Sequence, residues 1–262
     1  MKTVRDFAAA KRERRKIVVS TAYDAWSARL LVEAGVDCIL VGDSAMMVVH
    51  GEKDTLGATV ELMALHTQAV RRGAPELFIV ADMPFLSVRK GKAHAATAAG
   101  TLLRAGAQAV KVEGVQGHLD VIAHLVESGI PVMGHLGLLP QSVNVLGGYP
   151  VQGRDTAGMA RLQQAGAELQ AAGAFATVLE CVPHTLARII TRDLDIPTIG
   201  IGAGRDCDGQ VLVFHDFLGL NPGFHPRFVR RFADGAALVL AGTKKYTAAV
   251  RSGKFPGPKE SF

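Results

Sequence analysis

Eight short apolar runs alternate with stretches of helical composition along this chain of 262 residues. Each run is rich in Val, Ile, Leu and Ala without polar alternation, which is typical of strands buried on both faces of a parallel sheet. We expect strands at Ile17–Thr21, Cys38–Gly42, Leu77–Ala81, Ala109–Val112, Ile130–Gly134, Phe175–Leu179, Thr198–Ile201 and Gln210–Phe214. Eight such repeats favour a closed (β/α)8 TIM barrel over an open sheet.

The segments between these runs predict the outer helices of the barrel. They are Ser27–Ala34, Thr59–Arg72, Ala93–Ala105, Gly117–Ser128, Ala157–Ala172 and Pro183–Arg192. The link between the last two strands is short and glycine-rich, so no full helix is expected there, whereas Pro226–Val250 can form one or two more helices. No internal linker interrupts the pattern, which predicts a single barrel domain over residues 1–262.

Charge and hydropathy exclude several classes of function. The net charge is +5, but the one dense basic run, Lys11 to Lys16, has no interleaved aromatic residues, so we expect a solvated N-terminal face and no nucleic-acid partner. No apolar run approaches the length of about 20 residues that a spanning helix needs, and the N-terminus lacks a secretory core, which predicts a cytoplasmic protein without a membrane partner. The three cysteines, Cys38, Cys181 and Cys207, lack metal-site spacing and are expected to be reduced thiols.

Five of the apolar runs end in an ionisable residue. These residues are Asp43, Asp82, Glu113, His135 and Glu180. In a TIM barrel the carboxyl ends of all strands converge on one mouth, so residues distant in sequence become neighbours there. Two segments at this mouth, Ser44–Ala58 and Leu136–Thr156, are longer than simple turns and are expected to act as lids or ligand clamps.

Three of these acids close successive strands, and like charges so close together need a cation. An all-oxygen ligand set suits a hard ion such as Mg²⁺, which typically takes one or two protein carboxylates and keeps waters. We predict Asp43 and Asp82 as direct ligands and Glu113 as a ligand through water. For Asp43 an alternative is to cap a helix that follows at Ser44.

The remaining ionisable residues suggest roles toward an anionic substrate. Lys111 shares a strand face with Glu113 and can neutralise a substrate carboxylate, form an ion pair with Asp82 or Glu113, or do both. Glu180 lies across the barrel from the acids, which favours a general base. His135 has three open roles: binding substrate, orienting a neighbour, or packing as a core histidine.

One glycine string, IGIGAG at Ile199–Gly204, spans the end of the seventh predicted strand and the turn after it, where barrels often bind phosphate. The string lacks the GxGxxG spacing and the lysine of a P-loop. Close approach of a ligand and tight packing of the backbone explain it equally well.

Seven motifs, in order and in register, resemble the ketopantoate hydroxymethyltransferase family from about Ile17 to Pro256. They are VGDS at Val41–Ser44, ADMPF at Ala81–Phe85, VKVEG at Val110–Gly114, GHLGLLPQS at Gly134–Ser142, LECVP at Leu179–Pro183, IGIGAG, and DGQVLVFHD at Asp208–Asp216. The resemblance implies a barrel of the phosphoenolpyruvate/pyruvate type that uses Mg²⁺. It implies transfer of a one-carbon unit from 5,10-methylenetetrahydrofolate to 3-methyl-2-oxobutanoate, giving 2-dehydropantoate for pantothenate and coenzyme A. It also implies a homo-oligomer, with a decamer as the expected form.

Carried over by motif, the family roles agree with those argued from the residues. The resemblance implies metal ligands at Asp43 and Asp82, a third acid near the ion at Glu113, and a proton acceptor at Glu180. It implies contacts to the oxo acid at Ser44, Asp82 and Lys111, and we also expect Asp43 and His135 to bind this substrate.

Departures from the family pattern concern the first long loop and the C-terminus. Ala45-Met46-Met47 stands where Leu-Gly-Met is usual, Glu52–Gly57 replaces the usual His-Asp and following Thr-Leu-Pro stretch, and Glu260 replaces His before the final Ser-Phe. These changes concern the lid and leave the acids intact.

The nearest alternative is another Mg²⁺-dependent 2-oxo-acid carbon–carbon lyase or phosphonomutase of the same barrel type. Such sites usually carry a catalytic cysteine in a loop after a metal-side strand, and none of the three cysteines is expected there.

Overall fold

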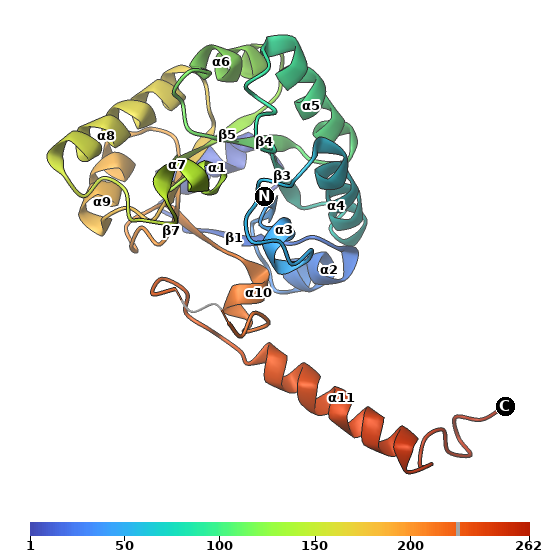
Figure 1. Ribbon diagram of the computed structural model, residues 1–262. Helices are drawn as coiled ribbons and strands as arrows, with labels where there is room; N and C mark the ends of the chain where they lie inside the picture. Colours follow the sequence, from blue (N-terminus) through green and yellow to red (C-terminus); the bar gives the residue numbers. More distant parts are fainter. Residues whose placement is uncertain (224–225) are drawn as a thin grey trace. The chain divides into compact units, whose positions relative to one another are not determined.

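A closed parallel barrel forms the larger of two compact units in the computed structural model, which describes residues 1–223 and 226–262. The barrel unit is Met1–Val213, and its strands pair in chain order until β8 meets β1 (Figure 1). The strands are β1 Ile17–Thr21, β2 Cys38–Val41, β3 Phe78–Asp82, β4 Ala109–Glu113, β5 Val132–Gly137, β6 Ala176–Glu180, β7 Thr198–Ile201 and β8 Gly209–Leu212. The predicted TIM barrel is confirmed.

Most strand bounds differ from the prediction by one or two residues, and some of the differences affect the site. β3, β4 and β6 each include the acid that was expected just beyond them, so Asp82, Glu113 and Glu180 are the last residues of strands. β5 starts later than predicted because Pro131 has no N–H to donate to a ladder. Residues that end a strand are held on both sides by neighbouring strands, which gives their side chains fixed positions.

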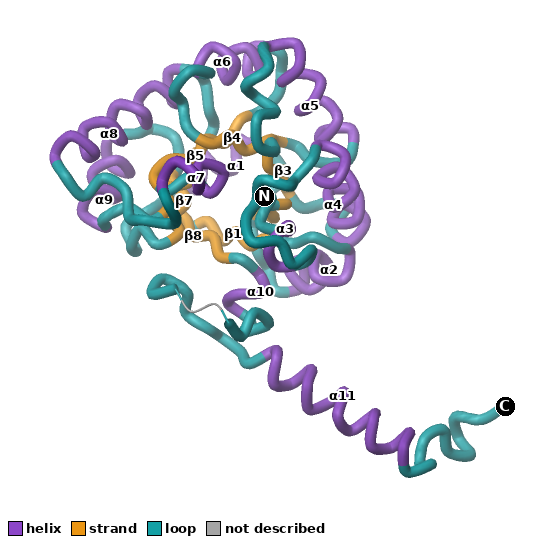
Figure 2. Tube along the Cα trace, in the orientation of Figure 1, coloured by secondary structure: helices purple, strands orange, loops and turns teal. Residues whose placement is uncertain are grey.

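Helices form an outer ring around the strands within Met1–Val213 (Figure 2). The ring consists of α2 Ala25–Glu33, α4 Val60–Gly73, α5 Lys92–Arg104, α6 Leu119–Glu127, α8 Thr156–Ala171 and α9 His184–Asp193. Short helices occupy the two long loops: α3 Ala45–Val48 follows β2, and η1 Pro140–Ser142 and α7 Val143–Leu146 follow β5. As predicted, no helix connects β7 to β8, all of whose linking residues are described.

An N-terminal helix that the sequence reasoning missed, α1 Val4–Arg12, packs on the barrel core. Phe7 is fully buried, and its ring meets Phe78 and Phe175 edge to face, each at 5.1 Å between ring centroids. The sequence does carry a signal for this helix, because Thr3 followed by Asp6 three residues later forms a capping box. In the structure, the Asp6 carboxylate accepts hydrogen bonds from the backbone N–H groups of Lys2 (2.8 Å) and Thr3 (2.9 Å).

The basic run Lys11–Lys16 was predicted to be a solvated face, and for Lys11 this prediction is wrong. Lys11 Nζ donates to Asp208 Oδ2 and to the carbonyl of Thr191, both at 2.8 Å, and only 16% of its side chain is exposed. Lys16 donates to the carbonyl of Cys207. These lysines hold the start of the chain to α9 and to the loop before β8, where they bind the part-buried Asp208 carboxylate and two backbone carbonyls.

The second unit, Phe214–Phe262, contains α10 Phe214–Phe217 and α11 Gly235–Arg251. α11 confirms the predicted helix within Pro226–Val250. None of its residues is buried, although it carries several large apolar side chains.

In the described part of the chain, no helix combines the length and apolarity that crossing a membrane would require. The single domain over 1–262 stays a prediction.

Candidate active site at the carboxyl ends of the strands

The strand register brings four of the predicted site residues side by side. Asp82 at the end of β3 is the cross-strand partner of Lys111 on β4, and Glu113 at the end of β4 is the partner of His135 on β5. Adjacent parallel strands lie about 4.8 Å apart, so these side chains meet at the same level of the barrel. The predicted convergence of distant residues on one mouth therefore occurs.

Asp43 joins this group from the end of β2. Its backbone N–H donates to Asp82 Oδ2 at 3.0 Å, and its own Oδ2 accepts from Gln141 Nε2 at 2.8 Å. The alternative that Asp43 caps the next helix is wrong, because Ser44 is the N-cap residue of α3 and no side chain caps it. Ser44 Oγ lies 2.9 Å from the hydroxyl of Tyr23, which fixes it beside the acids.

Lys111 lies buried among the acids, as its strand phase predicted. Its Nζ is 3.2 Å from Asp82 Oδ1, 4.0 Å from Glu113 Oε1 and 3.0 Å from His135 Nδ1. The surrounding carboxylates raise its pKa despite burial, which alone would lower it. The ion pair with Asp82 is thus present, and contact with a substrate carboxylate stays a prediction.

His135 connects this cluster to Glu180. Its Nδ1 lies 3.5 Å from Glu113 Oε1, and its Nε2 lies 3.1 Å from Glu180 Oε2, outside the angles of a hydrogen bond. Only 2% of the His135 side chain is exposed, compared with 14% of Glu180. These contacts support an orienting role for His135, while its direct contact with substrate stays a prediction.

The backbone at Gly137 holds Glu180 in place. Gly137 pairs with Glu180 across β5 and β6, has φ of 93°, and directs the N–H of Leu138 onto the Glu180 carbonyl at 2.8 Å. A Cβ at Gly137 would lie 2.1 Å from that carbonyl oxygen, so no other residue fits without moving the strand.

Gln141 is the site residue that sequence reasoning missed. It lies in η1 and reaches the ends of three strands: Nε2 donates to Asp43 Oδ2 and to the carbonyl of Met83 (3.0 Å), and its backbone N–H donates to Glu113 Oε2 at 3.1 Å. The motif LLPQS contains it, but no spacing rule connects a loop residue to an acid 98 positions away.

The electrostatics of the acids suit a cation. Burial raises the pKa of Asp43, and the neighbouring charges of Asp82 and Glu113 raise it further. Burial also raises the pKa of Asp82, against the opposing effect of Lys111. Asp82 Oδ1 and Glu113 Oε1 are buried and lack a hydrogen bond of normal geometry.

The same residues limit how a metal would be held. Among the described residues, no three His, Cys, Asp or Glu side chains are placed to hold an ion together. Mg²⁺ needs only one or two protein carboxylates beside water and substrate oxygens, so two direct ligands and a third acid farther out fit this donor set. The arrangement supports the predicted Asp43, Asp82 and Glu113 set, which stays a prediction.

Tight packing accounts for two glycines of the string at the end of β7, and ligand binding there stays a prediction. A Cβ at Gly204 would lie 2.5 Å from His184 Cβ, and one at Gly200 would lie 3.0 Å from Cys207 Sγ. All three cysteines are buried free thiols, which confirms that they form no disulfide framework.

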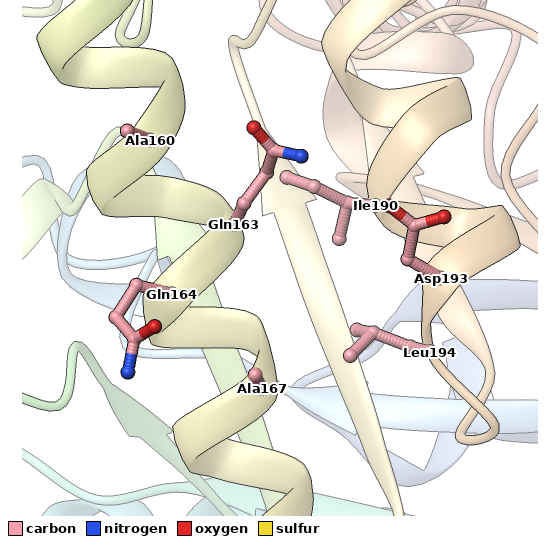
Figure 3. A pocket seen from close by; sticks show the side chains of 7 residues that line it. All are labelled: Ala160, Gln163, Gln164, Ala167, Ile190, Asp193 and Leu194. Atoms are coloured by element: carbon pink, nitrogen blue, oxygen red, sulfur yellow. The ribbon is translucent and has the colours of Figure 1, made fainter.

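A shallow hollow of about 390 Å³ lies between α8 and α9, on the outer layer of the barrel (Figure 3). It is lined by Ala160, Gln163, Gln164, Ala167, Ile190, Asp193 and Leu194. None of the predicted site residues contributes to this lining.

Sequence comparison decides the family. A family model described as ketopantoate hydroxymethyltransferase matches residues 1–258. The chain belongs to this family. A 3-methyl-2-oxobutanoate hydroxymethyltransferase of Bdellovibrio bacteriovorus is 52% identical over 262 residues, the whole of both chains. Another ketopantoate hydroxymethyltransferase relative, from Legionella pneumophila, is 48% identical over 260 residues, 99% of each chain.

Solved structures place the fold of this ketopantoate hydroxymethyltransferase family member among known barrels. Phosphonopyruvate hydrolase in complex with oxalate and Mg²⁺ aligns with a TM-score of 0.64 and 14% identity, over 99% of this chain and 93% of that one. A 2,3-dimethylmalate lyase of the PEP mutase/isocitrate lyase superfamily aligns with a TM-score of 0.61 and 18% identity, with the same coverage. These likenesses agree with the closed parallel barrel of this chain, and the phosphoenolpyruvate/pyruvate type stays a prediction.

Proposed function

We propose that this protein transfers a hydroxymethyl group from 5,10-methylenetetrahydrofolate to 3-methyl-2-oxobutanoate and forms 2-dehydropantoate. The observation that carries the proposal is that Glu180 lies beside His135, whose other ring nitrogen contacts Lys111 and Glu113. The family to which the chain belongs is named for this reaction. The names of the full-length relatives support the activity.

The reaction requires a base, because the C3–H next to a ketone is a weak acid. Glu180 is the most exposed carboxylate of the cluster and can take this proton, and His135 Nε2 lies 3.1 Å from its Oε2. Lys111 offsets the charge of the substrate carboxylate, and Ser44 lies beside the acids as a further contact.

Asp43 and Asp82 would hold Mg²⁺ directly, with Glu113 binding through a water. The bound ion would supply Lewis-acid stabilisation of the negative charge that develops on the 2-oxo oxygen. Asp82 Oδ1 and Glu113 Oε1, which are buried and contact only the Lys111 and His135 side chains as ion pairs in the described structure, support the assignment for these two acids.

The test is an assay of the purified protein with Mg²⁺, 3-methyl-2-oxobutanoate and methylenetetrahydrofolate. We expect 2-dehydropantoate, and we expect the product to vanish with EDTA and return with added Mg²⁺. Cleavage of a 2-oxo acid without any dependence on folate would instead favour the lyase alternative.

The family resemblance also suggests a homo-oligomer, and we propose a decamer in the cytoplasm. The observation that supports association is α11, whose large apolar side chains are all exposed in the single chain. Exposed apolar surface of this kind is typical of protein interfaces.

A further inference from the structure

Each of the three acids has one oxygen bound by an N–H group, and the second oxygens of Asp82 and Glu113 face the Lys111 ammonium at 3.2 and 4.0 Å. Asp43 Oδ2 accepts from Gln141 Nε2, Asp82 Oδ2 accepts from the Asp43 N–H, and Glu113 Oε2 accepts from the Gln141 N–H. The other oxygens of Asp82 and Glu113 are buried without a hydrogen bond of normal geometry. A carboxylate held through one oxygen cannot rotate freely, so its second oxygen keeps one direction.

One residue, Gln141, provides two of these three hydrogen bonds. It provides them from a loop after β5, to acids that end β2 and β4, and its amide also binds the carbonyl of Met83 after β3. Both protons of Nε2 are therefore used on two neighbouring strand ends. Hydrogen bonds of this kind orient a metal-binding side chain, and their removal typically weakens metal affinity by roughly 10- to 100-fold.

We propose that Gln141 is a positioning residue for the metal centre, which orients Asp43 and Glu113 so that their second oxygens are the ones offered to the ion and its waters. This inference rests on the proposed function, because it needs the divalent ion of that site. It assigns Gln141 no contact with substrate. It also couples the β5 loop to the ion, since the residue that orients the acids belongs to that loop.

The test measures Mn²⁺ binding without substrate, by the loss of the free-ion signal in electron paramagnetic resonance. Gln141→Met keeps the length of the side chain and the backbone N–H that binds Glu113, and it removes both donors of Nε2, including the one that binds Asp43. We expect its dissociation constant for Mn²⁺ to rise by roughly 10- to 100-fold. Gln152→Met is the matched control, because Gln152 lies in the same loop and its Nε2 donates to the nearby carbonyl of Pro150, away from the acids. Its affinity should equal that of the parent.

The coupling between metal binding and the loop that contains Gln141 provides a second measurement. Binding free energies are reciprocal, so an ion that gains from Gln141 must also stabilise the Gln141 loop. Mg²⁺ should slow amide hydrogen exchange in residues 138–146 of the parent, and this protection should fall severalfold in Gln141→Met. Gln141→Leu serves as the second variant if the Met variant does not fold, with near-UV circular dichroism as the check.

The outcomes separate the two proposals. If the parent binds no Mn²⁺, the metal centre and this inference both fail. If the parent binds Mn²⁺ and Asp43→Asn abolishes that binding, the metal centre stands. Affinity within twofold of the parent in folded Gln141→Met would then overturn the inference alone. Tighter binding in that variant would overturn it as well, because Gln141 would then compete with the ion for Asp43.

Discussion

Glu180 provides the sharpest test of mechanism at the scale of one residue, because proton abstraction can be observed without folate. With Mg²⁺ in D₂O, the protein should exchange the C3 hydrogen of 3-methyl-2-oxobutanoate. Glu180→Gln keeps the size of the side chain and removes the base, so exchange should slow by roughly 100-fold or more. Nuclear magnetic resonance of the oxo acid measures this rate. Parental exchange with intact substrate binding would assign the base to another group, with His135 at 3.1 Å as the first candidate.

Substitution of Lys111 tests whether this residue binds the substrate or only forms a structural ion pair. Lys111→Met keeps most of the apolar stem and removes the charge that faces Asp82 at 3.2 Å. We expect kcat/KM to fall by an amount equivalent to about 1–3 kcal/mol, the range for a charge-assisted hydrogen bond. Steady-state kinetics measures the loss and thermal unfolding measures stability. A lower melting temperature with unchanged kcat/KM would leave only the structural role.

At the scale of elements, the β5–β6 pair determines where the base lies. Gly137→Ala adds a Cβ 2.1 Å from the Glu180 carbonyl at φ of 93°, so strand β5 or β6 must shift. We expect a loss of unfolding free energy of about 2–4 kcal/mol, typical of a backbone clash in a buried strand. Urea denaturation followed by circular dichroism provides the value.

Gly35→Ala is the matched control for this substitution. Gly35 has φ of 77°, but nothing lies within 4 Å of its added Cβ, so only backbone strain of about 1 kcal/mol is expected. Equal losses at both positions would show that the contact with Glu180 does not matter. Deuterium exchange into the oxo acid should fall in Gly137→Ala and stay parental in Gly35→Ala.

At the scale of the whole molecule, α11 is the element that we expect to mediate assembly. Val239 and Val250 are 60% and 45% exposed and lie eleven residues apart, three turns along one helix face. Val239→Glu should reduce the mass of the assembly in sedimentation equilibrium, because a charge at an apolar interface loses its hydration. Lys244→Glu lies on another face and should leave the mass unchanged. An unaltered mass in both variants would place the interface elsewhere.

Local patterns in the sequence were enough to predict the barrel and most of its site. The runs at β1 and β7, which are rich in β-branched residues, were predicted with their observed bounds, because the mostly buried strands of a barrel leave a local composition signal. The acids at the ends of β2, β3 and β4 were recognised because barrel topology brings all strand ends to one mouth. Lys111 was placed on their side by strand alternation alone.

Tertiary structure alone decided the features that connect residues far apart in the chain. Gln141 binds Asp43 across 98 positions, Lys11 binds Asp208 across 197, and Phe7 packs between Phe78 and Phe175. Composition and periodicity record only which face of an element is buried. They do not record which loop residue completes the hydrogen bonds of a buried carboxylate. That partner depends on where the loops pass once the barrel has closed, since most buried polar groups then find a hydrogen-bond partner within reach.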